Sequence, residues 1–183
     1  MRPYPDEILR SMRDTLDQSI IPNLRDQWAV YAAKVMDKMM EHLEIRWRRE
    51  APLLAEDTED LLGVLSGLRD ALGGPALAGH DGLAGLRGRV DAGVAEAVDR
   101  PADPTSIVSL TEHNEALRRL VVDAIEAMDA AAAAEPGLGE VLAAPREDIR
   151  CYLRRELDRD VELARPTFMS FAPPKPKKAG AKG

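Results

Sequence analysis

Apolar residues recur at intervals of three and four along most of the chain, which is the pattern of amphipathic helices. A first helix is predicted over residues 6–19, and a second, longer helix over residues 23–50, where no Gly or Pro occurs. The apolar positions of the second segment are Leu24, Trp28, Tyr31, Val35, Met39, Leu43 and Trp47, with Ala32 and Met36 widening the stripe. We expect this helix to end at Pro52 and most of its methionines to fill gaps in the core, although they could also contribute to an adaptable binding surface.

A third helix is predicted from Asp57 or Thr58 to Leu72, where leucines form a stripe that Gly63 and Gly67 weaken. Residues 73–104 are rich in Gly and Ala, yet apolar residues keep a spacing of three or four from Leu83 to Val98. Two interpretations of this middle segment stay open: a weak helix, or an inserted connection.

A fourth helix is predicted from Thr105 or Ser106 to the Ala-rich run before Pro136, then a short piece over residues 140–144. The last helix is expected to open with Pro145 in its first turn and to stop before Pro166. No segment alternates apolar and polar residues as a strand does. The pattern therefore predicts an all-α fold, a bundle of four to six helices, with one helical domain over residues 1–171.

Composition and charge limit the classes of partner. The chain has 183 residues and a formal net charge of −7, and four lysines but no acid lie in residues 172–183. We expect this Lys/Pro-rich tail to be disordered, because it has no apolar pattern and cannot bury enough surface to offset the entropy of ordering. The acidic remainder of the chain argues against nucleic acid as a partner. No apolar run is long enough to cross a membrane, and no secretory segment is recognisable, so a cytoplasmic location is expected.

No catalytic or cofactor signature stands out. Cys151 is the single cysteine, and the Gly-rich middle segment lacks the spacing of a phosphate-binding loop. We therefore predict no cofactor and, as the leading interpretation, no catalytic residues. The alternative is a metal-binding bundle of the DinB-like type that uses His42 and His113, although neither lies in a Glu-x-x-His pair and the third histidine, His80, would also have to converge on the metal.

Arginines and aromatic residues supply the candidate partner-binding positions, which are Trp47, Arg46, Arg49, Arg150 and Arg154. Arginine forks match carboxylates on a partner, but pairing with the chain's own acids, such as Glu156 with Arg159, is the favoured interpretation. Trp47 and Tyr31 would be anchors if they were exposed, although burial is expected for both.

Several short segments at the two ends of the chain resemble a known family. They are Arg2-Pro3 with Asp6 to Leu9, Val30 to Met36, Arg46 to Glu50, the set Leu110, Asn114, Leu117, Arg118 and Ile125, the pair Tyr152-Leu153, and Pro166 to Phe168. In these the chain resembles small helical proteins of unknown function that are encoded beside aminoglycoside-phosphotransferase-like kinases and acyl-CoA dehydrogenases. Residues 73–104 and the tail look like additions to that pattern.

The resemblance implies an accessory role. Kinases of that type phosphorylate hydroxyacyl-CoA intermediates, and a dehydrogenase-like enzyme then acts on the product. The small helical protein is expected to support the kinase without being a catalyst itself, and the resemblance assigns no functional residues. A third possibility is a homodimeric regulatory protein that uses the leucine stripe from Leu61 to Leu72.

Overall fold

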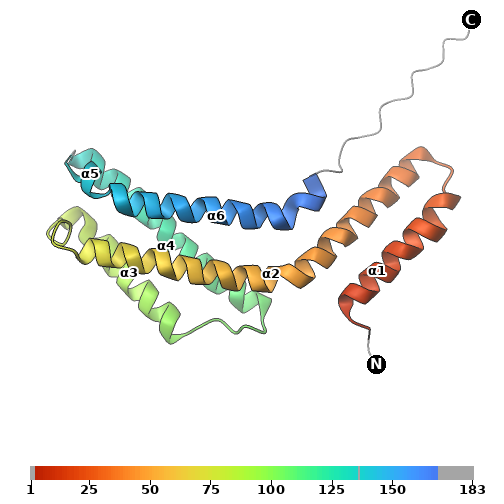
Figure 1. The fold of residues 1–183 in the computed structure, drawn as a ribbon, viewed down its shortest axis with the longest axis horizontal. Helices are drawn as coiled ribbons and strands as arrows, with labels where there is room; N and C mark the ends of the chain where they lie inside the picture. Colours follow the sequence, from red (N-terminus) through yellow and green to blue (C-terminus); the bar gives the residue numbers. More distant parts are fainter. Residues whose placement is uncertain (1–2, 136, 169–183) are drawn as a thin grey trace, which may run out of the picture. The chain divides into compact units, whose positions relative to one another are not determined.

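The computed structural model describes residues 3–135 and 137–168. Within these residues it contains α-helices, short helical turns and no strands, which confirms the predicted all-α class (Figure 1). The contacts divide the chain into two units. Among the described residues, unit 1 comprises 3–49 and 160–168, and unit 2 comprises 50–135 and 137–159. The expected tail over residues 172–183 lies outside the described residues.

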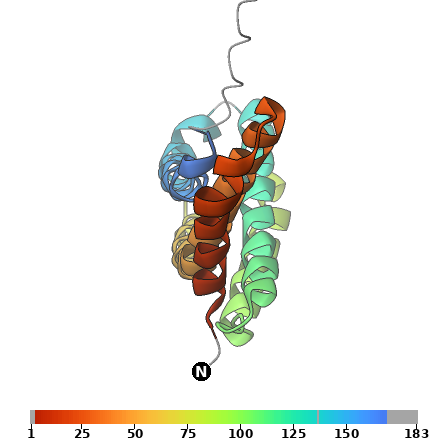
Figure 2. The same ribbon diagram turned by 90° about the vertical axis from the view of Figure 1, so that its right-hand side faces the viewer.

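Unit 1 is built around a helical hairpin. Helix α1 spans Pro5–Thr15 and is followed by a π-helical turn, Leu16–Ile20, and a 3₁₀ turn, Ile21–Asn23. Helix α2 then begins at Gln27, and its first part runs alongside α1 (Figure 1 and Figure 2). The α-helical part of the first segment thus ends earlier than predicted, because the chain passes into these turns before it reverses direction.

Ion pairs hold α1 against α2. The Arg13 guanidinium donates from Nε to the Asp37 carboxylate at 2.9 Å, and Arg48 donates to Asp6 at 2.6 Å. Among the described hydrophobic side chains of unit 1, only Leu16 and Ala33 are buried. Met36 and Met39, which were expected to fill gaps in the core, are exposed instead. Ion pairs thus lie between the two helices, while many large apolar side chains of the hairpin are exposed.

Helix α2 is much longer than predicted and spans Gln27–Gly73. The expected break at Pro52 was wrong, since this proline lies inside the helix. Proline removes one backbone hydrogen bond, but a helix tolerates that loss when packing stabilises the turns around it. The predicted second and third helices are consequently one helix, and its residues from Glu50 onward belong to unit 2.

Unit 2 adds helices α3 (Asp81–Asp99), α4 (Ile107–Ala134), α5 (Leu138–Val141) and most of α6 (Ala143–Phe168). Figure 2 shows the second part of α2 beside α6, and α3 beside α4. The core lies between these helices and contains the leucines of α2, the predicted stripe of α3 up to Val94, and Met128 and Tyr152. Within the leucine stripe, Leu61, Leu65, Leu68 and Leu72 are buried inside this unit, and Leu62 is partly buried against the same core.

The middle segment had two open interpretations, a weak helix or an inserted connection. In the structure it is helical from Asp81 to Asp99. Ala97 takes the last core position of α3, and Val98 is exposed instead. Helix α4 begins close to its predicted start, and Ser106 caps it, since its hydroxyl accepts the backbone N–H of Ser109 at 3.2 Å. Helix α6 continues to Phe168, beyond the end that was expected before Pro166.

Gly93 permits the close approach of α3 to α4, and this gives a first prediction. A Cβ atom added at Gly93 would lie 2.3 Å from Cδ1 of Leu120, whereas nothing lies within 4 Å of one added at Gly88 on the same helix. We expect Gly93→Ala to lower the free energy of unfolding by about 1 kcal/mol through overpacking. Gly88→Ala should raise it by about 0.5–1 kcal/mol through helix propensity. Chemical denaturation of both variants measures the difference, and an equal gain in both would show that the helices are not in close contact at Gly93.

Candidate functional site

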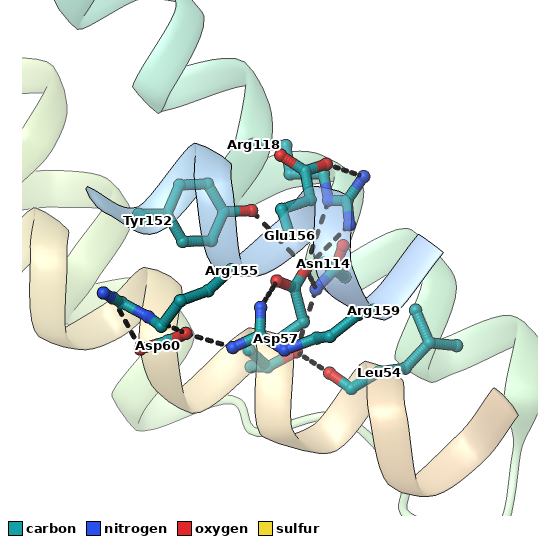
Figure 3. Close-up of polar contacts among 10 residues, drawn as sticks. Leu54, Asp57, Asp60, Asn114, Arg118, Tyr152, Arg155, Glu156 and Arg159 are labelled. Atoms are coloured by element: carbon teal, nitrogen blue, oxygen red, sulfur yellow. Dashed lines mark hydrogen bonds and ion pairs between the residues drawn. The ribbon is translucent and has the colours of Figure 1, made fainter. Parts of the chain in front are cut away.

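The most concentrated polar chemistry in unit 2 surrounds Asp57 on α2 (Figure 3). Asp57 is only 2% exposed, and it lies on the apolar face of α2 between Leu53 and Leu61, both of which are buried. A carboxylate in such an environment requires hydrogen bonds and a compensating charge. Side chains from α4 and α6 provide both.

Three helices converge on the Asp57 carboxylate. Its Oδ2 atom accepts Nδ2 of Asn114 at 2.8 Å and Nη2 of Arg118 at 2.8 Å, both from α4. Its Oδ1 atom accepts Nη1 of Arg159 from α6, and the Tyr152 hydroxyl lies 3.5 Å from Oδ2. One buried carboxylate therefore joins α2, α4 and α6.

Asp60 extends the network one helical turn further along α2. Arg155 donates to its two carboxylate oxygens from Nε and Nη2, each at 2.9 Å, and Arg159 donates to it as well (Figure 3). These hydrogen bonds, with that from Arg155 the strongest influence, lower the pKa of Asp60 and keep it ionised. The same contact raises the pKa of Arg155.

Tyr152 and Glu156 close the network from α6. Burial is the main cause that raises the pKa of the Tyr152 phenol, and the nearby Asp57 carboxylate raises it further, so this hydroxyl stays protonated. Arg118 makes a second ion pair, with Glu156. Burial works to lower the pKa of Arg118, but the carboxylates of Asp57 and Glu156 outweigh it and the net shift is upward.

The network is balanced in charge. It contains the acids Asp57, Asp60 and Glu156 and the bases Arg118, Arg155 and Arg159, and every one of them contacts a member of opposite sign. Such an arrangement has no excess charge with which to attract an ionic ligand. What it can do chemically is restrict the relative positions of three helices, because each bond has a defined direction.

A shallow groove of about 540 Å³ lies beside the network between α2 and α6. The residues that line it include Asp60 and Arg155 of the network, and Gly63, Gly67, Val64 and Cys151. The Cys151 sulfur lies 3.7 Å from a Glu147 carboxylate oxygen. The lining contains acids, the bases Arg155 and Arg159, and small apolar residues, and no histidine lies among them.

The predicted partner-binding arginines mostly contact acids of the chain itself. Arg150 and Arg154 both contact Glu147 on the same helix, and Arg49 pairs with Glu162 within unit 1. Arg46 lies on the exposed surface of α2. Internal pairing was the favoured interpretation for the arginines. The example given was the pair of Glu156 with Arg159. In the structure Glu156 contacts Arg118, and Arg159 contacts Asp57 and Asp60.

The two candidate metal-binding histidines belong to different units, His42 to unit 1 and His113 to unit 2. His113 lines a small cavity of about 290 Å³ together with Gly93, Arg100 and Leu120. Across residues 3–135 and 137–168, no three His, Cys, Asp or Glu side chains are grouped so that they could hold a metal ion.

Unit 1 carries the most unusual surface, because its large apolar side chains are exposed on both helices of the hairpin. Trp28 is 72% exposed and Trp47 is 61% exposed, and Ile8 and Met12 of α1 are also exposed. The expected burial of Trp47 was therefore wrong. The Tyr31 ring is half-buried and meets Trp28 edge to face, with 6.2 Å between the ring centroids.

Sequence reasoning missed Asp57 and Asn114 as parts of a site. The signal was present in the periodicity, since Asp57 and Asn114 each occupy a place where an apolar residue is due. Asn114 follows Leu110 by four residues and precedes Leu117 by three, and both leucines are buried. A polar residue in a buried register needs a buried partner, and the facing helices supply it.

Comparisons of the chain with protein-family models, with curated proteins and with solved structures find no match. Among the helices that the structure describes, none combines the length and the apolar character needed to cross a membrane. The fold and the site thus define a class only: an all-α protein with a polar network inside one unit and an exposed apolar surface on the other.

Proposed function

We propose that this protein is a non-catalytic helical accessory protein that acts by binding other proteins through unit 1. The observation that carries the proposal is the exposed apolar surface of the hairpin, where Trp28, Trp47, Ile8 and Met12 all face solvent. Large apolar side chains that remain exposed in one part of a protein are typical of protein interaction sites. Trp is also among the residues that contribute most to binding energy at interfaces.

The polar network supports the same proposal from unit 2. Its ionised groups are paired with one another and serve to hold helices together, so they offer no free acid, base or nucleophile for a reaction. An accessory protein needs a stable body and a binding surface. The network of unit 2 supports the first, and the exposed apolar side chains of unit 1 support the second.

As the partner we propose a phosphotransferase-like kinase that acts on hydroxyacyl-CoA intermediates, on the strength of the sequence resemblance. The test is affinity purification of the tagged full chain from its native cells, with the bound proteins identified by mass spectrometry. Recovery of such a kinase in near-equal amount is the expected result. Recovery of no kinase above background would overturn the proposal of a stable complex.

A matched pair of variants locates the binding surface. Ile8→Glu with Met12→Glu places two charges on the exposed side of α1, and the recovered kinase should fall by about 30-fold if these side chains are central to the interface. Val122→Glu changes a side chain that is equally exposed but lies on α4 in unit 2, and it should leave recovery unchanged. An equal effect of both changes would argue against unit 1 as the binding surface.

A further inference from the structure

Six exposed apolar residues follow one another along the first part of α2 and form what we call the α2 stripe: Trp28, Ala32, Met36, Met39, Leu43 and Trp47. The successive spacings are four, four, three, four and four residues. Positions separated by three or four residues lie on one side of a helix, so the six side chains share one face. One base, Arg46, lies at the edge of that face, three residues after Leu43; in an antiparallel pair it would be level with Ala29 of the other copy.

The α2 stripe is symmetric about its midpoint, which lies between Asp37 and Lys38. A tryptophan stands at each end, and a methionine stands on either side of the centre. A surface can pair with its own copy across a two-fold axis only if it is self-complementary when reversed. In an antiparallel pair centred on this midpoint, Trp28 of one copy is level with Trp47 of the other, and Met36 is level with Met39.

The remaining two positions add a complementarity of size. Ala32 of one copy is level with Leu43 of the other, so a small side chain faces a large one at two places in the pair. Alternation of small and large residues across facing helices is how helical interfaces interdigitate without voids. Because the stripe is uncharged, pairing brings no like charges into contact within it, although each whole chain carries a net charge of −7.

From this pattern we propose that a second copy of this chain covers the α2 stripe, with the two stripes antiparallel about a two-fold axis. The proposal rests on the proposed function, because it names the partner of one part of the same exposed surface. In this dimer the tryptophans contact the second copy, and the exposed residues Ile8 and Met12 of α1 remain available to the kinase. Unit 1 also needs such a cover, since Leu16 and Ala33 are the only buried hydrophobic residues among those described in it.

The size of the stripe sets the expected strength. Six side chains of these types at the observed exposure present on the order of 500 Å² per copy, so the pair buries about 1,000 Å² in total. That area lies at the lower limit of specific interfaces, and we therefore expect a dimer that dissociates in the micromolar range. The only two tryptophans of the chain both lie in the stripe, so their fluorescence reports the pairing directly.

The test measures the mass of the purified full chain by light scattering and its tryptophan emission over a dilution series. A dimer at high concentration is expected, with emission that shifts to longer wavelength as dilution separates the copies. Met39→Glu places two carboxylates close to the two-fold axis and should weaken the dimer by about 100-fold, because charges are buried without partners. Val122→Glu, on an equally exposed residue of unit 2, should leave the dimer intact.

A charge exchange tests the antiparallel register itself. Ala32→Lys and Leu43→Glu should each weaken the dimer, whereas the double variant should recover it, because the introduced ammonium of one copy is then level with the introduced carboxylate of the other. A parallel pair would set like charges level with each other and would not recover.

Two results would overturn the inference: a monomer at all concentrations, or a dimer that Met39→Glu leaves unchanged. Its failure can be told apart from failure of the proposed function. If the chain is a monomer but still binds the kinase, the proposed function stands without the dimer. If the chain is a dimer but binds no kinase, the inference stands and the proposed kinase partner is wrong.

Discussion

Replacement of Asp57 by alanine is expected to lower the free energy of unfolding by about 3 kcal/mol. The Asp57 carboxylate accepts hydrogen bonds from Asn114, Arg118 and Arg159, and through them it joins α2, α4 and α6. Without it, two guanidinium groups lose a counter-ion in a half-buried environment and the Asn114 amide loses its acceptor. The value lies at the lower end of the range for broken buried ion pairs, because Arg118 keeps Glu156 and Arg159 keeps Asp60.

The matched control is Glu59→Ala, two residues along the same helix, where the side chain is exposed. We expect that change to alter the free energy of unfolding by no more than about 0.5 kcal/mol. Urea denaturation followed by circular dichroism measures both variants. Asp57→Asn separates charge from shape, since it keeps the size of the side chain and removes its charge. If Asp57→Ala were as stable as Glu59→Ala, the network would not hold the three helices together.

Tyr152→Ala should have an effect of similar or greater size, a loss of about 4 kcal/mol in the free energy of unfolding. The Tyr152 ring is 1% exposed and packs in the core of unit 2, so its removal leaves a cavity that the surrounding leucines cannot fill. Its hydroxyl also reaches the Asp57 carboxylate. The residue thus belongs both to the apolar core and to the polar network.

Tyr152→Phe distinguishes these two roles. It keeps the ring and removes only the hydroxyl, whose distance of 3.5 Å from Asp57 marks a weak hydrogen bond. We expect a loss of no more than about 1 kcal/mol for this variant. Thermal denaturation of Tyr152→Ala and Tyr152→Phe compares the two losses of unfolding free energy. An equal loss in the two would mean that the hydroxyl, and not the packing of the ring, accounts for the role of Tyr152.

The two units use charge in opposite ways, and the contrast bears on function. In unit 2 the ionised groups of the network are gathered at one junction beside the apolar core, where Asp57 is buried and Arg118 and Arg155 are partly exposed. In unit 1 the ion pairs of Arg13 with Asp37 and of Arg48 with Asp6 lie between the helices, and many large apolar residues are exposed. Exposed ion pairs add little stability. We therefore expect unit 1 to depend on a protein partner for its stability more than unit 2 does.

Much of the helical architecture followed from the sequence alone. The spacing of apolar residues placed α4 correctly, and it located the buried stripes of α2 after residue 57 and of α3. These features are local, because a helix and its apolar face depend on residues three and four positions apart. The absence of alternating segments was sufficient to predict the all-α class.

The tertiary structure decided which apolar faces are covered and which polar residues meet. The stripes from Trp28 to Trp47 and from Leu61 to Leu72 have the same periodicity, yet the first is exposed and the second is buried. Periodicity shows that a helix has an apolar face, but it contains no information on whether another helix lies against that face. The meeting of Asp57 with Arg159, 102 positions away, depends likewise on how helices distant in sequence pack together.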